Sequence, residues 1–171
     1  AIATSKGKRL AEDFIFVLDA DMVPAKDPRP LINEHTDGIA FPLYDLWYED
    51  EYGMYLYRED HFWKGHKSRR MWMVKRPSEE NKWQWSGRGI HSGHFPENLN
   101  VLNPVFAPED FALLHYAYIS DALRYAKFQK YAEVGEQLNE FERLHAQSIV
   151  DTLPRLRPLE FTPTYRLQCE S

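Results

Sequence analysis

Cysteine is nearly absent from this sequence of 171 residues. The single thiol, Cys169, cannot close an internal disulfide, which favours a reducing compartment such as the cytoplasm. Long apolar runs are also missing, since no stretch approaches the roughly 18 consecutive apolar residues of a transmembrane helix. The opening residues, AIATSKGKRLAED, lack the apolar core of a signal peptide. The sequence therefore predicts a cytoplasmic protein without a membrane span.

An excess of positive charge is lacking as well. The net charge is −5 and the pI is about 5.8, which argues against a protein that binds nucleic acid through phosphate contacts. The sequence has instead 43% hydrophobic residues, enough for one globular domain with a packed core. Its aromatic residues concentrate between Phe41 and Trp85, where they form either a large core or a stacking surface for a ring-shaped ligand.

The hydrophobic pattern predicts an α/β fold with one central strand. FIFVLD, residues 14–19, is short, apolar, β-branched and aromatic up to its final acid, as in a strand buried on both faces. From Gly38 to Lys75 the apolar period changes to two, which predicts an antiparallel β-meander. Ser120 can cap a long C-terminal helix whose apolar positions continue to Leu144.

The same pattern predicts a body over residues 1–151 and a tail over 152–171. The tail is punctuated by prolines and is either packed on the body or a linker. Only the strand at 14–18 has the signature of a central buried strand, whereas a doubly wound domain needs several. The body therefore looks like the second part of an α/β fold whose first part is missing.

Two carboxylates, Asp19 and Asp21, follow this strand directly. Ligands of open α/β sheets bind at the carboxyl ends of strands, and acids placed there are costly unless they are solvated or bind a cation. Two hard oxygen ligands around a bend suit Mg²⁺ or Mn²⁺ that holds phosphate oxygens. The alternative is a solvated turn, where aspartate is common.

Three histidines are further candidates. His91 and His94 lie in GIHSGHFP, and His115 lies in the apolar run LLHYAYI. A histidine in such a run is more often a core residue than a ligand, and His115 gains a role only if the fold places it beside Asp21. Oxygen and imidazole ligands together would favour Mn²⁺, whereas the spacing of the three histidines matches no compact zinc template.

Three blocks carry a resemblance to a known family. SKGKRLAEDFIFVLDADMVP, WSGRGIHSGHFPENL and LLHYAYISDALRYAKFQKY occur in this order over roughly residues 4–135. Together they resemble the second half of a family 2 glycosyltransferase with the GT-A fold. The resemblance implies a partial GT-A-like fold, in which residues 1–151 form the metal and acceptor side.

The resemblance also implies roles for particular residues. Asp21 would be a direct metal ligand, Asp19 would face the ribose or a metal-bound water, and His115 would be the late metal-ligand histidine. His91 would line the site near the donor phosphates or the acceptor. Apart from the resemblance, the charge of Arg88 could offset that of the donor phosphates, with solvation at the surface as the alternative. The cation, Mn²⁺ or Mg²⁺, would bridge the diphosphate of a nucleotide-sugar donor and stabilise the leaving nucleotide.

Two parts of the family pattern have no clear counterpart in the sequence. One is the nucleotide-binding half, which would be a partner of this chain. The other is the carboxylate that deprotonates an acceptor hydroxyl. Glu97 is the first candidate for this base and Asp110 the second, although an acid at a helix start explains Glu97 equally well.

Tryptophans could bind a carbohydrate acceptor by stacking on a sugar face. Trp47 and Trp85 are the first candidates, and Trp63 and Trp83 belong to the same aromatic region. Packing against the long C-terminal helix is the alternative for all four.

Two other functions also explain VLDADMV. In a haloacid-dehalogenase-like phosphatase Asp19 would be the nucleophile, Asp21 the acid/base and Val23 the residue at the fifth motif position. That family requires a complete doubly wound fold, whereas a meander is expected here. A non-catalytic transferase-like module that binds carbohydrate or a partner chain is the third hypothesis.

Overall fold

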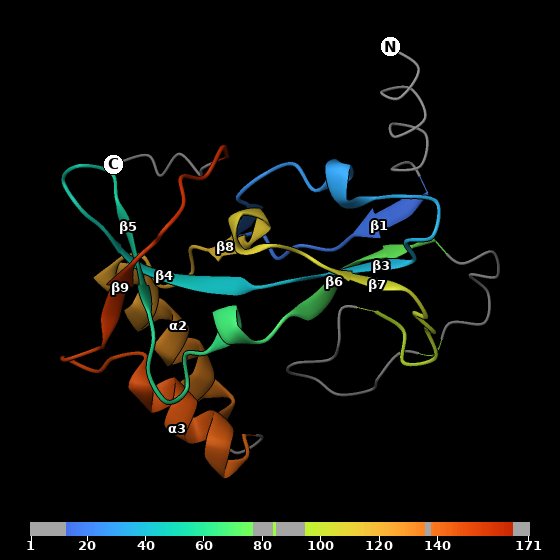
Figure 1. Cartoon of the computed structure of the whole chain (residues 1–171). Helices are drawn as coiled ribbons and strands as arrows, with labels where there is room; N and C mark the ends of the chain where they lie inside the picture. The colour runs from blue at the N-terminus through green and yellow to red at the C-terminus, as the bar shows by residue number, and fades with distance from the viewer. Residues whose placement is uncertain (1–12, 77–83, 85–94, 136–137, 166–171) are drawn as a thin grey trace.

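The computed structural model describes residues 13–76, 84, 95–135 and 138–165. Over these ranges the chain forms two β-sheets and two α-helices, a mixed α/β arrangement in which sheet predominates (Figure 1). The helices are α2 (Asp121–Glu133) and α3 (Glu140–Ser148). The strands are β1 (Phe14–Phe16), β2 (Met22–Pro24), β3 (Gly38–Phe41), β4 (Leu43–Glu49), β5 (Tyr55–Arg58), β6 (Arg70–Lys75), β7 (Pro104–Phe106), β8 (Leu113–His115) and β9 (Leu156–Pro158). Short 3-10 helices are η1 (Arg29–Leu31), η2 (Gly65–Lys67) and η4 (Glu109–Phe111).

The first sheet has the strand order β1-β6-β3-β7, and the second has the order β2-β8-β4-β5-β9. The β3–β7 and β4–β8 pairs are parallel, and the other strand pairs are antiparallel. The chain passes from the first sheet to the second three times, from β1 to β2, from β3 to β4 and from β7 to β8. Pro42 separates β3 from β4, because a residue without an N–H cannot continue the ladder. Figure 1 shows β3 leading directly into β4 across this point.

The strand predicted at residues 14–19 is neither as long nor as central as expected. β1 covers Phe14–Phe16, its residues are half-buried, and β6 is its one strand neighbour within the described ranges. Val17 extends the pairing by donating to the carbonyl of Trp72 at 3.0 Å. The apolar character of the run comes from one-sided packing, in which Phe16 stacks on Phe41 with ring centroids 5.3 Å apart. The acids Asp19 and Asp21 still follow the carboxyl end of this strand.

The predicted meander is confirmed for its first turn, and its last strand forms as predicted but belongs to the other sheet. β4 and β5 form an antiparallel hairpin whose turn contains Gly53 at φ 75°, a conformation that favours glycine. β6, however, lies in the other sheet between β1 and β3. The reason is burial: Trp72, Met73 and Val74 are consecutive and all buried, so both faces of β6 need cover.

The long helix predicted after Ser120 is two helices. Ser120 caps α2 as expected, since its Oγ accepts from Leu123 N at 3.3 Å. α2 ends before Gly135, and a new N-cap at Asn139 starts α3 with a capping box to Glu142. Neither helix, nor any other in the described ranges, is long and apolar enough to cross a membrane.

The segment predicted as a tail is packed on the body. β9 pairs with β5 at the end of the second sheet, and Leu159 N donates to the carbonyl of Tyr55 at 2.9 Å. Beyond it, Thr164 N donates to the carbonyl of Ala25 at 2.7 Å. Residues 152–165 therefore complete the second sheet instead of forming a linker.

The two faces of the second sheet carry different cores. One face buries tyrosines and leucines, with Phe161 packed against them. The other buries Trp47, Trp63 and Tyr118 against Ile149, which directly follows α3. Helices α2 and α3 lie together beside this sheet (Figure 1). Strand alternation thus divides the sheet into a tyrosine face and a tryptophan face.

Candidate functional site

The side chains of Asp21, Asp45 and His115 come together near the start of β2, where the chain enters the second sheet. Met22 pairs with His115 across β2 and β8, and Tyr116 N donates to the carbonyl of Asp21 at 2.8 Å. On the other side of β8, Asp45 of β4 is in parallel register with His115. The backbone ladder alone therefore places the histidine between the two acids.

The side chains make the contacts that this register allows. His115 Nδ1 lies 2.7 Å from Asp45 Oδ1, and His115 Nε2 lies 3.5 Å from Asp21 Oδ1. The side chains of His115 and Asp45 are 9% and 14% exposed, whereas that of Asp21 is 38% exposed. The Tyr118 ring covers the imidazole edge-on, with ring centroids 5.2 Å apart. The cluster is thus buried at Asp45 and open to solvent at Asp21.

The electrostatics of the cluster follow from these contacts. Burial by itself lowers the pKa of His115, but its hydrogen bonds with Asp21 and Asp45 raise that pKa to about 9. The same bond with His115 lowers the pKa of the Asp21 carboxyl, against the opposing effect of partial burial. The imidazole therefore carries a proton near neutral pH, and a metal ion binding at Nε2 has to displace it.

A positive charge from α2 also acts on this cluster. After the bond with His115, the attraction of Lys127 is a further influence that lowers the pKa of Asp21. Lys127 Nζ lies 6.0 Å from the centroid of the Tyr118 ring, the ring that covers His115. The open end of the cluster thus has both a carboxylate and a nearby ammonium group.

The donor set fits a hard or borderline divalent cation. Asp21 offers a carboxylate oxygen and His115 offers Nε2, while Asp45 holds the other ring nitrogen, as carboxylates commonly do behind a metal-bound histidine. Within the described ranges, no group of three or more His, Cys, Asp or Glu side chains forms a complete metal site. A cation here would need further oxygen ligands from water or substrate phosphates, which is usual for Mg²⁺ and Mn²⁺.

Asp19 lies close to this cluster in the sequence but is more exposed. It begins the tight turn that links β1 to β2, and its carbonyl accepts from Met22 N at 3.0 Å. This turn brings Asp21 to the start of β2, and the exposed Asp19 side chain lies two residues before it.

The two candidate bases are not brought to the cluster by any contact in the part of the chain described. Glu97 is exposed, and its backbone N–H donates to the carbonyl of Gln84 at 2.8 Å. Asp110, in η4, pairs with Lys26 Nζ at 2.5 Å. The geometry gives neither carboxylate a position against Asp21 or His115.

Trp47 belongs to the core instead of to an open surface. Its side chain packs edge-on against Trp63 at 4.9 Å and stacks with Tyr118 at 5.7 Å, and the residue is 3% exposed. Trp63 is 2% exposed in the same core. The packing alternative therefore describes these two rings, and Trp47 has no free face for a sugar. Trp83, Trp85, Arg88, His91 and His94 lie outside the described residues.

Asp45 is the site residue that sequence reasoning missed. It stands in PLYDLWY, an acid at an inner position of an otherwise apolar strand. A carboxylate removed from water requires a charged or hydrogen-bonding partner, so the position of Asp45 in the sequence itself indicates that such a partner exists. The partner, His115, could not be assigned because it depends on the parallel pairing of β4 with β8.

Comparisons with family models, with curated proteins and with solved structures found no match to this chain.

Proposed function

We propose that this chain is the metal-binding part of a glycosyltransferase that moves a sugar from a nucleotide-diphosphate sugar to an acceptor hydroxyl. The observation that carries the proposal is the contact between Asp21 and His115, with Asp45 behind the imidazole. The family resemblance pairs these first two residues as metal ligands although they are distant in the sequence. Their meeting in the fold supports it independently of the resemblance.

In this proposal Asp21 and His115 hold Mn²⁺ or Mg²⁺. The bound cation would supply positive charge to stabilise the leaving nucleotide diphosphate. Asp45 accepts the Nδ1 proton, so once the Nε2 proton is displaced the lone pair of Nε2 would be available to the cation on the side of Asp21. Lys127 adds a positive charge at the open end of the cluster, where it would attract a diphosphate.

The phosphatase hypothesis has less support. It needs a D-x-D motif on a central strand of a doubly wound parallel sheet, and β1 pairs antiparallel with β6. It also needs Asp21 to exchange protons with a leaving group, whereas this carboxylate is engaged by His115. The hypothesis of a non-catalytic binding module is separated from the proposal only by experiment.

The first experiment measures Mn²⁺ binding by electron paramagnetic resonance, with and without UDP or GDP. We expect Mn²⁺ to bind and Asp21→Asn and His115→Gln each to weaken binding by at least about tenfold. Asp110→Asn is the matched control, because its carboxylate is paired with Lys26 and should leave the affinity unchanged. Equal Mn²⁺ binding by all four proteins would overturn the metal assignment.

A second measurement separates the enzyme from the alternatives. Release of UDP or GDP from nucleotide sugars, dependent on Mn²⁺ and lost in Asp21→Asn, is expected of a transferase. Metal binding without any such release would favour the non-catalytic module. Trapping of Asp19 by beryllofluoride would favour the phosphatase instead.

A further inference from the structure

Helix α2 turns one face toward the body of the protein. Arg124, Lys127, Phe128 and Tyr131 follow helical spacing and are half-buried, whereas the residues between them are exposed. Phe128 and Tyr131 pack against the tryptophan face of the second sheet. Such an inward position is unusual for a lysine, because its ammonium group is partly removed from water there.

Lys127 also lacks an acidic partner in the part of the chain that the structure describes. Four lysine or arginine residues of this part are half-buried or buried: Lys26, Arg58, Arg124 and Lys127. The first three each form an ion pair with an aspartate, whereas Lys127 forms none within these ranges. An anionic ligand would supply the partner that this ammonium group lacks.

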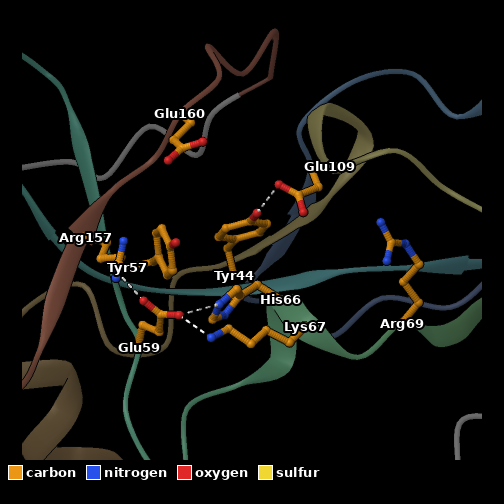
Figure 2. A pocket seen from close by; sticks show the side chains of 9 residues that line it. All are labelled: Tyr44, Tyr57, Glu59, His66, Lys67, Arg69, Glu109, Arg157 and Glu160. Atoms are coloured by element: carbon orange, nitrogen blue, oxygen red, sulfur yellow. Dashed lines mark hydrogen bonds and ion pairs between the residues drawn. The ribbon is translucent and has the colours of Figure 1, made fainter.

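The cationic side chains on the tyrosine face of the sheet are different. They line a groove of about 390 Å³, in which Glu59 forms ion pairs with both Lys67 and Arg157 (Figure 2). Arg69, the third cationic residue of the groove, is exposed and donates to the carbonyl of Ala107 at 2.9 Å. These three residues are therefore either paired with an acid or open to water.

The ammonium group of Lys127 lies near the open end of the Asp21 cluster. Its Nζ is 6.0 Å from the centroid of the Tyr118 ring, which covers His115. In the proposed function a divalent cation takes the place of the His115 proton and offsets the carboxylates of Asp21 and Asp45. The charge of Lys127 is then left over for a ligand. That ligand should be an anion long enough to reach both the cation and the ammonium group.

Arg124 holds Lys127 in place from one turn away on the same helix face. Its guanidinium group donates to the carbonyl of Trp47 at 2.7 Å and to the carbonyl of Tyr118, and its side chain is only 15% exposed. Trp47 belongs to β4 and Tyr118 follows β8, the two strands on which the metal cluster is built. Because α2 has no fully buried residue of its own, this contact ties its first half to the cluster.

We propose that Lys127 is a direct ligand of the donor diphosphate, that it makes the site select a diphosphate over a monophosphate, and that Arg124 is its positioning residue. The inference rests on the proposed function. A single phosphate group can be held by the cation alone, whereas two linked phosphate groups reach both positive centres. A lysine suits this role, because its ammonium group is a compact charge with three donors on a flexible stem.

The test titrates the chain, saturated with Mn²⁺, with UDP and with UMP by isothermal titration calorimetry. We expect UDP to bind at least about tenfold more tightly than UMP. Lys127→Gln should lower the UDP affinity by about tenfold, change the UMP affinity by less than about threefold and leave Mn²⁺ binding intact. Lys127→Arg keeps the charge and should retain most of the UDP affinity. Lys130→Gln is the matched control, because Lys130 is an exposed residue of the same helix.

The readout for Arg124 is the ratio of the UDP and UMP affinities. Arg124→Gln should reduce this ratio without weakening Mn²⁺ binding, while circular dichroism reports whether the helices are retained. Asp121→Asn removes only the exposed partner of Arg124 and should leave the ratio unchanged. An unchanged ratio in Arg124→Gln would exclude the positioning role.

The outcomes separate this inference from the metal assignment. Equal binding of UDP and UMP by the unmodified chain, no binding of UDP, or an unchanged UDP affinity in Lys127→Gln would each overturn the inference while the metal assignment stands. Failure of the unmodified chain to bind Mn²⁺ would overturn both.

Discussion

His115 and Asp45 face each other across the parallel strands β8 and β4, with Nδ1 and Oδ1 2.7 Å apart. This bond fixes which ring nitrogen faces Asp21. Because Asp45 accepts at Nδ1, the other ring nitrogen, Nε2, lies on the side of the half-exposed Asp21 carboxylate. A largely buried acid thereby sets the orientation of the imidazole toward the half-exposed Asp21.

The first prediction concerns Asp45 as a positioning residue. Asp45→Asn keeps the size of the side chain but removes the charge that supports the imidazole. Mn²⁺ affinity should fall by about 10- to 100-fold while the fold is retained. Isothermal titration calorimetry measures the affinity, and circular dichroism reports the fold. The same loss in Glu133→Gln, an exposed acid at the end of α2, would contradict a specific effect of Asp45.

The second prediction is a pH dependence of stability in metal-free buffer. The folded pKa of His115 is about 9, above the unfolded value of 6.5, so protonation favours the folded state. This contribution is complete below pH 6.5 and is lost as the pH rises through 9. The difference corresponds to a free energy of unfolding on the order of 3 kcal/mol. Urea unfolding from pH 6 to 10 measures it, and His115→Gln should remove the decline.

The third prediction links the same proton to metal binding. A cation at Nε2 must displace the His115 proton. Below pH 9, Mn²⁺ affinity should therefore increase by about tenfold for each unit by which the pH is raised. Calorimetry in buffers of different ionisation enthalpy should find about one proton released for each Mn²⁺ bound. A flat affinity between pH 6.5 and 8.5 would show that His115 is not a ligand.

The fourth prediction concerns a buried arginine that joins β5 to the end of α3. Arg58 is 3% exposed; its guanidinium lies 4.7 Å from the Trp47 ring and pairs with Asp151 at 2.7 Å. It also donates to the carbonyl of Ser148. Arg58→Met should lower the free energy of unfolding by about 3 kcal/mol, because it removes the buried charge-assisted bond to the Ser148 carbonyl and the ion pairs with Asp60 and Asp151. Arg143→Met, at an exposed position of α3, should change it by less than about 0.5 kcal/mol.

The fifth prediction compares two glycines. A Cβ added at Gly38 would lie 2.7 Å from both Met71 Sδ and Val101 Cγ1, whereas one at Gly135 would meet nothing within 4 Å. Gly38→Ala should therefore cost about 1–3 kcal/mol through overpacking of the first sheet. Gly135→Ala should be neutral or stabilising by up to about 1 kcal/mol. Thermal unfolding of the two variants checks the contrast.

Local signals in the sequence predicted several features correctly. The N-cap at Ser120, the β4–β5 hairpin and the turn position of Asp19 and Asp21 each depend on neighbouring residues. The sequence gives His115 a role only if the fold places it beside Asp21, and the two side chains do lie 3.5 Å apart. Each of these features could be stated before the strand order was known.

Features that depend on long-range pairing could not be predicted in this way. The apolar run at β1 was interpreted as a central strand, since periodicity does not tell one buried face from two. β6 was assigned to the meander because it follows β5 in the sequence, whereas its buried side chains place it in the other sheet. Asp45 was missed and Trp47 was given a surface role for the same reason, because their neighbours come from β8 and from the segments around α2 and α3.

The three passages between the sheets have a consequence for unfolding. Because β1–β2, β3–β4 and β7–β8 each contribute to both sheets, neither sheet can come apart while the other keeps its strands in register. The described part of the chain should therefore behave as one cooperative unit, with similar hydrogen-exchange protection in β3 and β4. Asp21 and His115 lie close to the passage from β1 to β2, so a cation bound there, as we propose, would slow the opening of both sheets together.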